Sequence, residues 1–273
     1  MRRLLSLIVL LLTAAAAMAQ SNWNYTTKTN IRYTQSNDSY ARERCMLDVY
    51  YPTDGKDAPV VVWFHGGGLT GGNRFVPEEL MKAGLVVVSV NYRLMPRVAI
   101  GDCIDDAACA TAWAMKHAAE YNGSPQKVYV TGHSAGGYLT SMIGLDKKWM
   151  AKYGADADAI AALLPLSGQA ITHFALREQQ GIPAYQATID EYAPLTFVRP
   201  DAAPILVISG DRNQEMNGRY EEQAYFWRML KLCGHPKAWL YEMQGYDHGE
   251  MYRPGLGVVK KYIRAMEEGR EWK

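Results

Sequence analysis

One serine in the chain lies in a sequence that is typical of catalytic nucleophiles. Residues 132–136 read Gly132-His133-Ser134-Ala135-Gly136 and come directly after the apolar run Val128–Val130. Such a pentapeptide forms a sharp turn between a strand and a helix, which exposes the serine hydroxyl. The flanking glycines let the backbone make that turn. We therefore expect Ser134 to be an activated nucleophile, which requires a base that takes its proton.

A glycine-rich segment upstream of this serine is suited to stabilising an oxyanion. His65-Gly66-Gly67-Gly68 follows the strand-like run 60–64. Attack on an acyl carbon places negative charge on the former carbonyl oxygen, and backbone N–H groups directed at it lower the barrier. Glycines leave room for the backbone to approach the substrate. We expect the N–H groups of Gly67, Gly68 and Ala135 to be these donors.

The base is expected to be a histidine that follows Ser134 in the chain. His248 lies in Gly245-Tyr246-Asp247-His248-Gly249, a turn after the last strand-like run. From this position its imidazole can lie at the same sheet edge as Ser134. The competing candidate is His173, which lies in a segment that could fold over the site. We favour His248.

The third catalytic group, a carboxylate that orients the histidine, has two candidates. It is expected after the strand-like run 205–208, where the chain reads Ser209-Gly210-Asp211-Arg212-Asn213-Gln214-Glu215. Asn213 occupies the position that such enzymes often use, and an amide cannot carry the charge that stabilises an imidazolium. The longer side chain of Glu215 could reach from a displaced position. We favour Glu215 over Asp211, which could instead brace the loop.

Short apolar runs alternate with helical patterns through most of the chain. Unbroken apolar runs between helices are typical of a mostly parallel sheet covered by helices on both faces, which is an α/β fold. Residues 46–51 alternate in polarity and predict an antiparallel edge strand, while residues 20–40 predict an edge strand or a loose arm. Helices are predicted over residues 106–121, 135–143 and 258–266, and another ends at Gly234. The predicted apolar strands are 60–64, 85–90, 128–130, 160–166, 205–208 and 239–243.

The sequence also predicts how the chain is divided into a leader, a domain and an insertion. Residues 1–19 have a charged head, an apolar stretch and Ala17-Met18-Ala19, as in a cleaved signal peptide, so we expect export to the periplasm or secretion. Residues 20–273 are expected to form a single domain. Residues 167–203 interrupt the alternation, and so long a segment inside a compact domain is usually functional. We expect it to form a lid or insertion over the site.

Composition and cysteine spacing exclude several classes of function. The net charge is +1 without a basic block, so no nucleic-acid partner is expected. No later segment is apolar enough to insert stably in a membrane, and no metal-ligand motif is present, so no metal or other cofactor is expected. Export permits disulfides among Cys45, Cys103, Cys109 and Cys233. Cys103 and Cys109 could form a local bridge, and buried free thiols are the alternative.

The motifs together resemble the α/β-hydrolase fold, and within it the esterase and lipase group related to hormone-sensitive lipase. The resemblance spans roughly residues 45–265 and is carried by His65-Gly66-Gly67-Gly68, Asn91-Tyr92-Arg93-Leu94, Gly132-His133-Ser134-Ala135-Gly136-Gly137 and His248. It implies Ser134 as nucleophile, His248 as base, and Gly67, Gly68 and Ala135 as oxyanion donors. The chain departs from this group at the acid loop and lacks long N-terminal cap helices. It is therefore more similar to small secreted acetyl- and feruloyl-esterase-like members.

These residues lead to an expected activity and two alternatives. We expect a serine carboxylic-ester hydrolase acting on short-chain acyl esters, including acetyl or feruloyl groups on carbohydrates. The substrate is then a small-molecule or carbohydrate ester. One alternative is a serine peptidase or amidase of the same fold, because the catalytic groups are shared. The other is a non-catalytic binding protein on a hydrolase scaffold.

Overall fold

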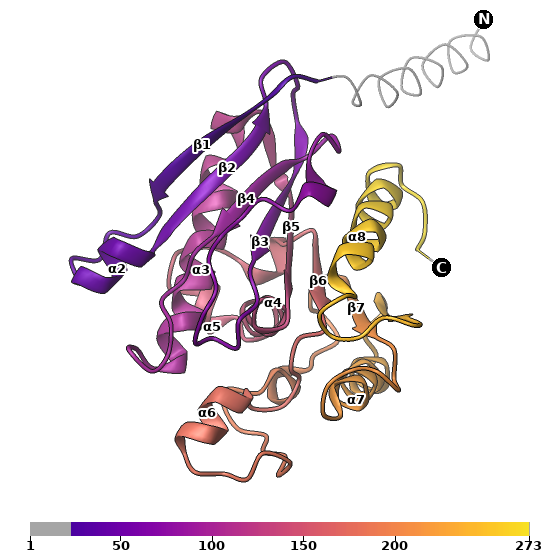
Figure 1. Ribbon diagram of the computed structural model, residues 1–273. Helices are drawn as coiled ribbons and strands as arrows, with labels where there is room; N and C mark the ends of the chain where they lie inside the picture. Colours follow the sequence, from indigo (N-terminus) through magenta and orange to yellow (C-terminus); the bar gives the residue numbers. More distant parts are fainter. Residues whose placement is uncertain (1–22, 273) are drawn as a thin grey trace, which may run out of the picture.

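A computed structural model describes residues 23–272, which form an eight-stranded sheet in the order β1-β2-β4-β3-β5-β6-β7-β8. The strands from β4 to β8 along this order are parallel, and β1 and β2 pair antiparallel at one side. The predicted α/β fold with a mostly parallel sheet is confirmed (Figure 1). The strands are β1 (Tyr25–Arg32), β2 (Met46–Pro52), β3 (Ala58–Phe64), β4 (Val86–Val90), β5 (Gly123–His133), β6 (Ala162–Leu166), β7 (Ile205–Gly210) and β8 (Ala238–Met243).

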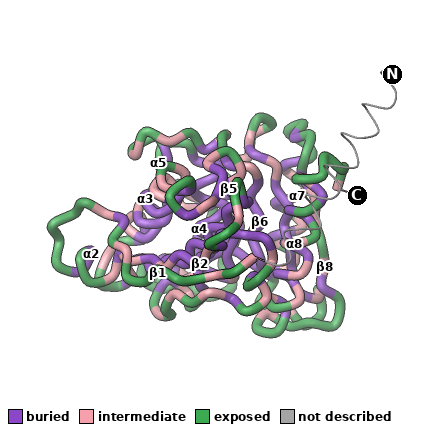
Figure 2. Tube along the Cα trace, turned by 90° about the horizontal axis from the view of Figure 1, so that it is seen from above, coloured by how far each residue is buried: buried purple, intermediate pink, exposed green. Residues whose placement is uncertain are grey.

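The apolar runs are unbroken because both faces of the sheet are buried. In β3 the side chains of Val60, Val62 and Phe64 enter one core cluster, while those of Val61 and Trp63 enter the other. This follows from the alternation of side chains across a strand. Figure 2 shows buried residues gathered along the strands and on the inner sides of the helices, with exposed residues mainly in the connections.

Helices cover the two faces unequally. The first cluster packs under α3 (Ile100–His117), α4 (Ala135–Leu145) and α7 (Arg219–Leu232), and the second packs under α8 (Tyr252–Glu267). The shorter helices connect these layers. They are α2 (Ser39–Arg44), η2 (Glu78–Leu80), η3 (Ala118–Tyr121), α5 (Lys148–Ala151), η4 (Ala157–Ala159), α6 (Phe174–Gln179) and η5 (Pro194–Phe197).

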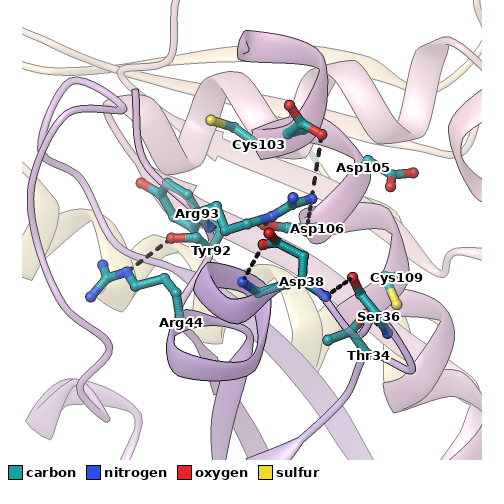
Figure 3. Close-up of polar contacts among 12 residues, drawn as sticks. Thr34, Ser36, Asp38, Arg44, Tyr92, Arg93, Cys103, Asp105, Asp106 and Cys109 are labelled. Atoms are coloured by element: carbon teal, nitrogen blue, oxygen red, sulfur yellow. Dashed lines mark hydrogen bonds and ion pairs between the residues drawn. The ribbon is translucent and has the colours of Figure 1, made fainter. Parts of the chain in front are cut away.

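Helix α3 begins six residues earlier than the predicted start at residue 106, and Asp106 is buried in its middle. The Asp102 carboxylate accepts the N–H of Ala99 at 3.1 Å and so caps the true N-terminus. Asp106 instead accepts two hydrogen bonds from the guanidinium of Arg93, each at 2.8 Å (Figure 3). The prediction was wrong because a buried ion pair makes an interior carboxylate compatible with the helix.

The antiparallel side also differs from the prediction. Strand β2 is not the sheet edge, because β1 pairs with its outer side and occupies the edge. The unpredicted helix α2 lies just before β2, and its N-terminus is capped by Asp38, which accepts the N–H of Ala41 at 2.8 Å. Local polarity in residues 20–40 could not distinguish an arm from a strand followed by a short helix.

The cysteines do not form the local bridge that export would permit. Cys45, Cys103 and Cys109 are buried free thiols, and Cys233 is an exposed free thiol. Cys103 and Cys109 both lie in α3, six positions apart, so they project from different sides of the helix. The leader expected over residues 1–19 lies outside the described residues. No helix within residues 23–272 has the length and apolar character needed to cross a bilayer.

Residues 167–203 form α6, η5 and irregular connections beyond the sheet edge at which the parallel strands end (Figure 1). The segment is attached to the domain at several points. The Tyr138 hydroxyl of α4 donates to the carbonyl of Tyr192 at 2.8 Å, and Nε2 of Gln223 in α7 donates to the carbonyl of Gly168 at 3.0 Å.

Candidate active site

Ser134 lies in the turn between β5 and α4 and has a left-handed φ of 56°. That conformation is rare for a residue with a side chain. It is held here because the N–H of Ser134 donates to the Leu166 carbonyl at 2.8 Å, at the end of the neighbouring strand. A Cβ atom on Gly136 would overlap the Phe64 carbonyl oxygen, so the turn can pack against the end of β3 only with glycine there.

The structure brings Ser134, His248 and Glu215 into one hydrogen-bonded series. Oγ of Ser134 lies 2.9 Å from Nε2 of His248, and Nδ1 of His248 lies 2.9 Å from Oε2 of Glu215. In this arrangement the hydroxyl donates to Nε2, and the N–H at Nδ1 donates to the carboxylate. A base that is hydrogen-bonded to a hydroxyl and oriented by a carboxylate is the arrangement that activates a serine.

Glu215 accepts hydrogen bonds from further groups besides His248. It also accepts the N–H of Met216 at 2.9 Å and a hydrogen bond from the hydroxyl of Ser167, whose Oγ lies 3.1 Å from Nδ1 of His248. Burial raises the pKa of Glu215, but the hydrogen bond and charge of His248, the Met216 N–H and the nearby Arg219 outweigh it and lower the pKa overall. The carboxylate is therefore ionised where it meets the imidazole.

Ser167 was missed in the sequence because its neighbourhood carries no motif. It follows β6 and has a φ of 49°, and its carbonyl accepts a hydrogen bond from the buried Arg219 of α7 at 2.5 Å. Its contact with Glu215 joins residues far apart in the chain, so local sequence could not have identified it.

Asp211, the other carboxylate considered, is bound elsewhere. Its two oxygens accept the N–H groups of Gly245 at 2.7 Å and Asn213 at 2.8 Å. These backbone hydrogen bonds, that of Gly245 first, lower the pKa of Asp211. The structure does not bring this carboxylate to His248; Asp211 instead joins its own turn to the loop that carries the histidine.

The glycine segment lies next to Ser134. A Cβ atom placed on Gly66 would be 3.5 Å from Cβ of Ser134. Within residues 23–272 no protein group accepts a hydrogen bond from the N–H of Gly67, Gly68 or Ala135. In the described part of the chain these three N–H groups thus have no protein acceptor.

His65 fixes the start of the oxyanion loop, defined here as residues 65–74. Its ring stacks on Tyr92 with centroids 4.4 Å apart, and the Tyr92 hydroxyl donates to the His65 carbonyl at 2.8 Å. Nδ1 of His65 donates to the Gly66 carbonyl at 2.6 Å. Burial lowers the pKa of His65 to about 4, so the ring is neutral near pH 7.

Arg44 fixes the far end of the oxyanion loop. Its guanidinium donates to the carbonyls of Gly72 at 2.5 Å and Tyr92 at 3.0 Å, as Figure 3 shows for the second bond. Neither Arg44 nor Tyr92 was predicted as a site residue. Tyr92 belongs to the motif Asn91-Tyr92-Arg93-Leu94, which was the available signal.

Two further histidines support the site through the backbone. Nε2 of His133 donates to the His248 carbonyl at 2.8 Å, and burial lowers the pKa of His133 to about 4, helped by the nearby His248. His173, the competing candidate base, is fully buried and caps α6 by accepting the N–H of Ala175 at 3.2 Å. The structure gives His173 no hydrogen bond to Ser134.

Within the described residues, no group of three or more His, Cys, Asp or Glu side chains could hold a metal ion.

Solved structures share this architecture over almost the whole chain. A truncated carbohydrate esterase from gut microbiota superposes with a TM-score of 0.72, covering 89% of this chain and 96% of that one at 19% identity. This chain has the α/β-hydrolase fold. A butyrate-bound esterase 2 from Thermogutta terrifontis gives a TM-score of 0.70, covering 88% and 94% of the two chains at 21% identity.

Sequence comparisons of this chain also find esterases. Residues 47–162 match the family model named BD-FAE. A probable isoprenylcysteine alpha-carbonyl methylesterase from Oryza sativa is 28% identical over 180 residues, which cover 59% of this chain and 42% of the relative. The carboxylesterase NlhH of Mycobacterium tuberculosis is 39% identical over 101 residues, covering 35% and 32%. The chain thus spans less than half the length of these curated relatives, and the resemblance to the esterase and lipase group is confirmed.

Proposed function

We propose that this α/β-hydrolase is a serine carboxylic-ester hydrolase. The observation that carries the proposal is the series from Ser134 Oγ to His248 Nε2 and from His248 Nδ1 to Glu215, with 2.9 Å at each step. The esterase names of its sequence relatives support the same reaction class.

The reaction begins when Nε2 of His248 takes the proton of Ser134 and Oγ forms a bond to the ester carbonyl carbon. The carbonyl oxygen becomes an oxyanion, which accepts hydrogen bonds from the N–H groups of Gly67, Gly68 and Ala135. The C–O bond to the alcohol then breaks, and the imidazolium gives its proton to the leaving oxygen. Water attacks the acyl-enzyme by the same route and releases the acid.

The substrates that we propose are esters of short acyl groups, including acetyl or feruloyl groups on carbohydrates. The fold shared with a carbohydrate esterase and with a butyrate-bound esterase agrees with this class. We also propose that residues 1–19 direct export, so that the enzyme acts in the periplasm or outside the cell.

Hydrolysis of p-nitrophenyl acetate by the wild type and Ser134→Ala tests the reaction. Loss of the nucleophile is expected to lower kcat by at least about 10⁴-fold, as for other serine hydrolases. A fluorophosphonate probe should label the wild type at Ser134 and leave Ser134→Ala unlabelled. Ser141→Ala is the matched control, because Ser141 lies in α4 and its hydroxyl donates only to the Gly137 carbonyl at 3.2 Å. Equal rates for wild type and Ser134→Ala would contradict the proposal, and faster cleavage of amide than ester substrates would favour an amidase.

A further inference from the structure

The ring of Phe174 lies against the oxyanion loop. A Cβ atom placed on Gly68 would be 2.9 Å from Cζ of Phe174, so the ring edge faces the backbone of this glycine. Gly68 has a φ of 63° and supplies one of the N–H groups that we assign to the substrate carbonyl oxygen. An ester whose carbonyl oxygen is bound there carries one of its two substituents toward this ring.

Hydrogen bonds to its neighbours fix the position of Phe174. It is the first residue of α6, and its N–H donates to Oε1 of the buried Gln169 at 2.8 Å. The side chain of His173 caps the same helix, and its ring stacks on Phe174 with centroids 4.6 Å apart. His173 in turn packs on Tyr138 of α4, with ring centroids 4.9 Å apart.

A buried arginine fixes the rest of the surrounding segment. Nε of Arg177 donates to the Thr172 carbonyl at 3.1 Å, and Nη1 donates to the carbonyls of Ala184 at 3.0 Å and Gln186 at 2.7 Å. These bonds connect both sides of α6 through one guanidinium. The ring of Phe174 therefore belongs to a segment that these hydrogen bonds hold in a fixed position.

The position of His248 indicates which substituent of the ester, the acyl group or the alcohol, faces the ring of Phe174. The leaving oxygen must approach Nε2 of His248, because it receives its proton there. The His133 ring packs beside His248 and beside Tyr252 of α8, which lies against the second core cluster. Phe174 lies against the first cluster, and α6 is well apart from α8 (Figure 1). The alcohol thus faces His248, and the acyl group faces Phe174.

We propose that Phe174 limits the length of the acyl group in this site, an inference that rests on the ester hydrolysis proposed above. The acyl group then extends from Ser134 toward the ring beside Gly68, and each methylene added to a straight chain brings it closer to that ring. One methylene too many in a closed pocket lowers kcat/KM by about 10- to 200-fold. Of the substrates proposed above, acetyl esters are therefore preferred, and longer acyl groups such as hexanoyl and feruloyl are rejected.

Two series of esters test this assignment. In the first, p-nitrophenyl acetate, butyrate and hexanoate vary the acyl group with one leaving group, and in the second, acetates of different alcohols vary only the alcohol. Phe174→Ala is expected to raise the hexanoate-to-acetate ratio of kcat/KM by at least about 10-fold. It should leave the ranking of the acetates unchanged. Phe174→Trp is expected to lower the butyrate-to-acetate ratio, which keeps the test decisive if Phe174→Ala fails to fold.

Phe197→Ala is the matched control, since Phe197 lies in the same 167–203 segment but packs near Lys148. It should keep the wild-type acyl profile. An acyl profile that is unchanged in the Phe174 variants, or a shift confined to the alcohol series, would overturn the assignment while leaving ester hydrolysis intact. Failure of the proposed function would look different, because no ester would be hydrolysed and Ser134 would not be labelled.

Discussion

At the residue scale, the two carboxylates of the loop 211–215 accept hydrogen bonds from different groups. Glu215 meets Nδ1 of His248, whereas Asp211 accepts two backbone N–H groups, one of them from Gly245 in the histidine loop. Glu215 lies four residues after Asp211 in the chain. Its side chain has one methylene more than that of aspartate, and the turn at 211–215 brings its carboxylate back to the imidazole of His248. The N–H of Glu215 donates to the Asp211 carbonyl at 2.7 Å, which closes this turn.

Isosteric amide variants at the two positions distinguish these roles. Glu215→Gln removes the charge that stabilises the imidazolium and orients its tautomer, so we expect kcat to fall by about 10³- to 10⁴-fold. Asp211→Asn keeps one acceptor oxygen and should lower kcat by less than about 10-fold, since it acts only through the loop. Esterase kinetics of both purified variants provide the measurement. A larger loss in Asp211→Asn than in Glu215→Gln would reverse the assignment.

At the scale of elements, the oxyanion loop depends on contacts with the segment that follows β4. The ring of Tyr92 stacks on His65, and its hydroxyl donates to the His65 carbonyl immediately before the three glycines. Gly67 and Gly68 both have positive φ angles, and as glycines they have no side chains that could pack and hold them in place. The placement of the oxyanion donors must come from such neighbours.

Tyr92→Phe tests this dependence by removing a single hydroxyl. We expect the free energy of unfolding to fall by about 1 kcal/mol, and kcat to fall by roughly 10-fold because the loop loses one anchor. Tyr129→Phe is the matched control, since this buried tyrosine donates to Glu267 at 2.8 Å from a different part of the sheet. Urea unfolding and ester hydrolysis are measured for both. If both variants lose equal stability and equal activity, the hydroxyl of Tyr92 has only a structural role.

At the scale of the whole molecule, buried neutral histidines make the fold sensitive to acid. Burial lowers the pKa of His65 and His133 to about 4, and it also lowers the pKa of His173 and His235. The unfolded chain binds protons at His65 and His133 below about pH 6.5, whereas the folded chain does not until about pH 4. Folding therefore excludes protons from these two histidines in this window, and their contribution lowers the stability as the pH falls from about 6.5 to 4.

A single-histidine variant isolates this effect from the buried carboxylates. Asp106 and Glu222 have pKa values raised by burial, so they oppose the histidines as the pH falls. We expect the stability of His133→Gln to depend less steeply on pH than that of the wild type, by up to about 1.4 kcal/mol per pH unit between pH 4 and 6.5. Urea unfolding at several pH values measures both slopes. They should coincide above pH 7, and equal slopes at pH 5 would contradict the burial of a neutral His133.

Much of the fold was predictable because periodicity and local motifs report local structure. The apolar runs predicted six parallel strands, and the glycines around Ser134 predicted a strand-turn-helix because only a few backbone conformations fit that pattern. The start of α3 was wrong because Asp106 pairs with Arg93, a partner that periodicity cannot indicate.

The sequence by itself determined the sheet, the turn that presents Ser134, and the set of residue types from which a hydrolytic site could be built. Only the tertiary structure decided which carboxylate meets His248, that Ser167 joins them, that the cysteines stay apart, and that Phe174 faces Gly68. The physical reason is the distance along the sequence over which each effect acts. Strand and turn preferences act within a few residues. Hydrogen bonds between loops depend instead on where the whole chain places their backbones.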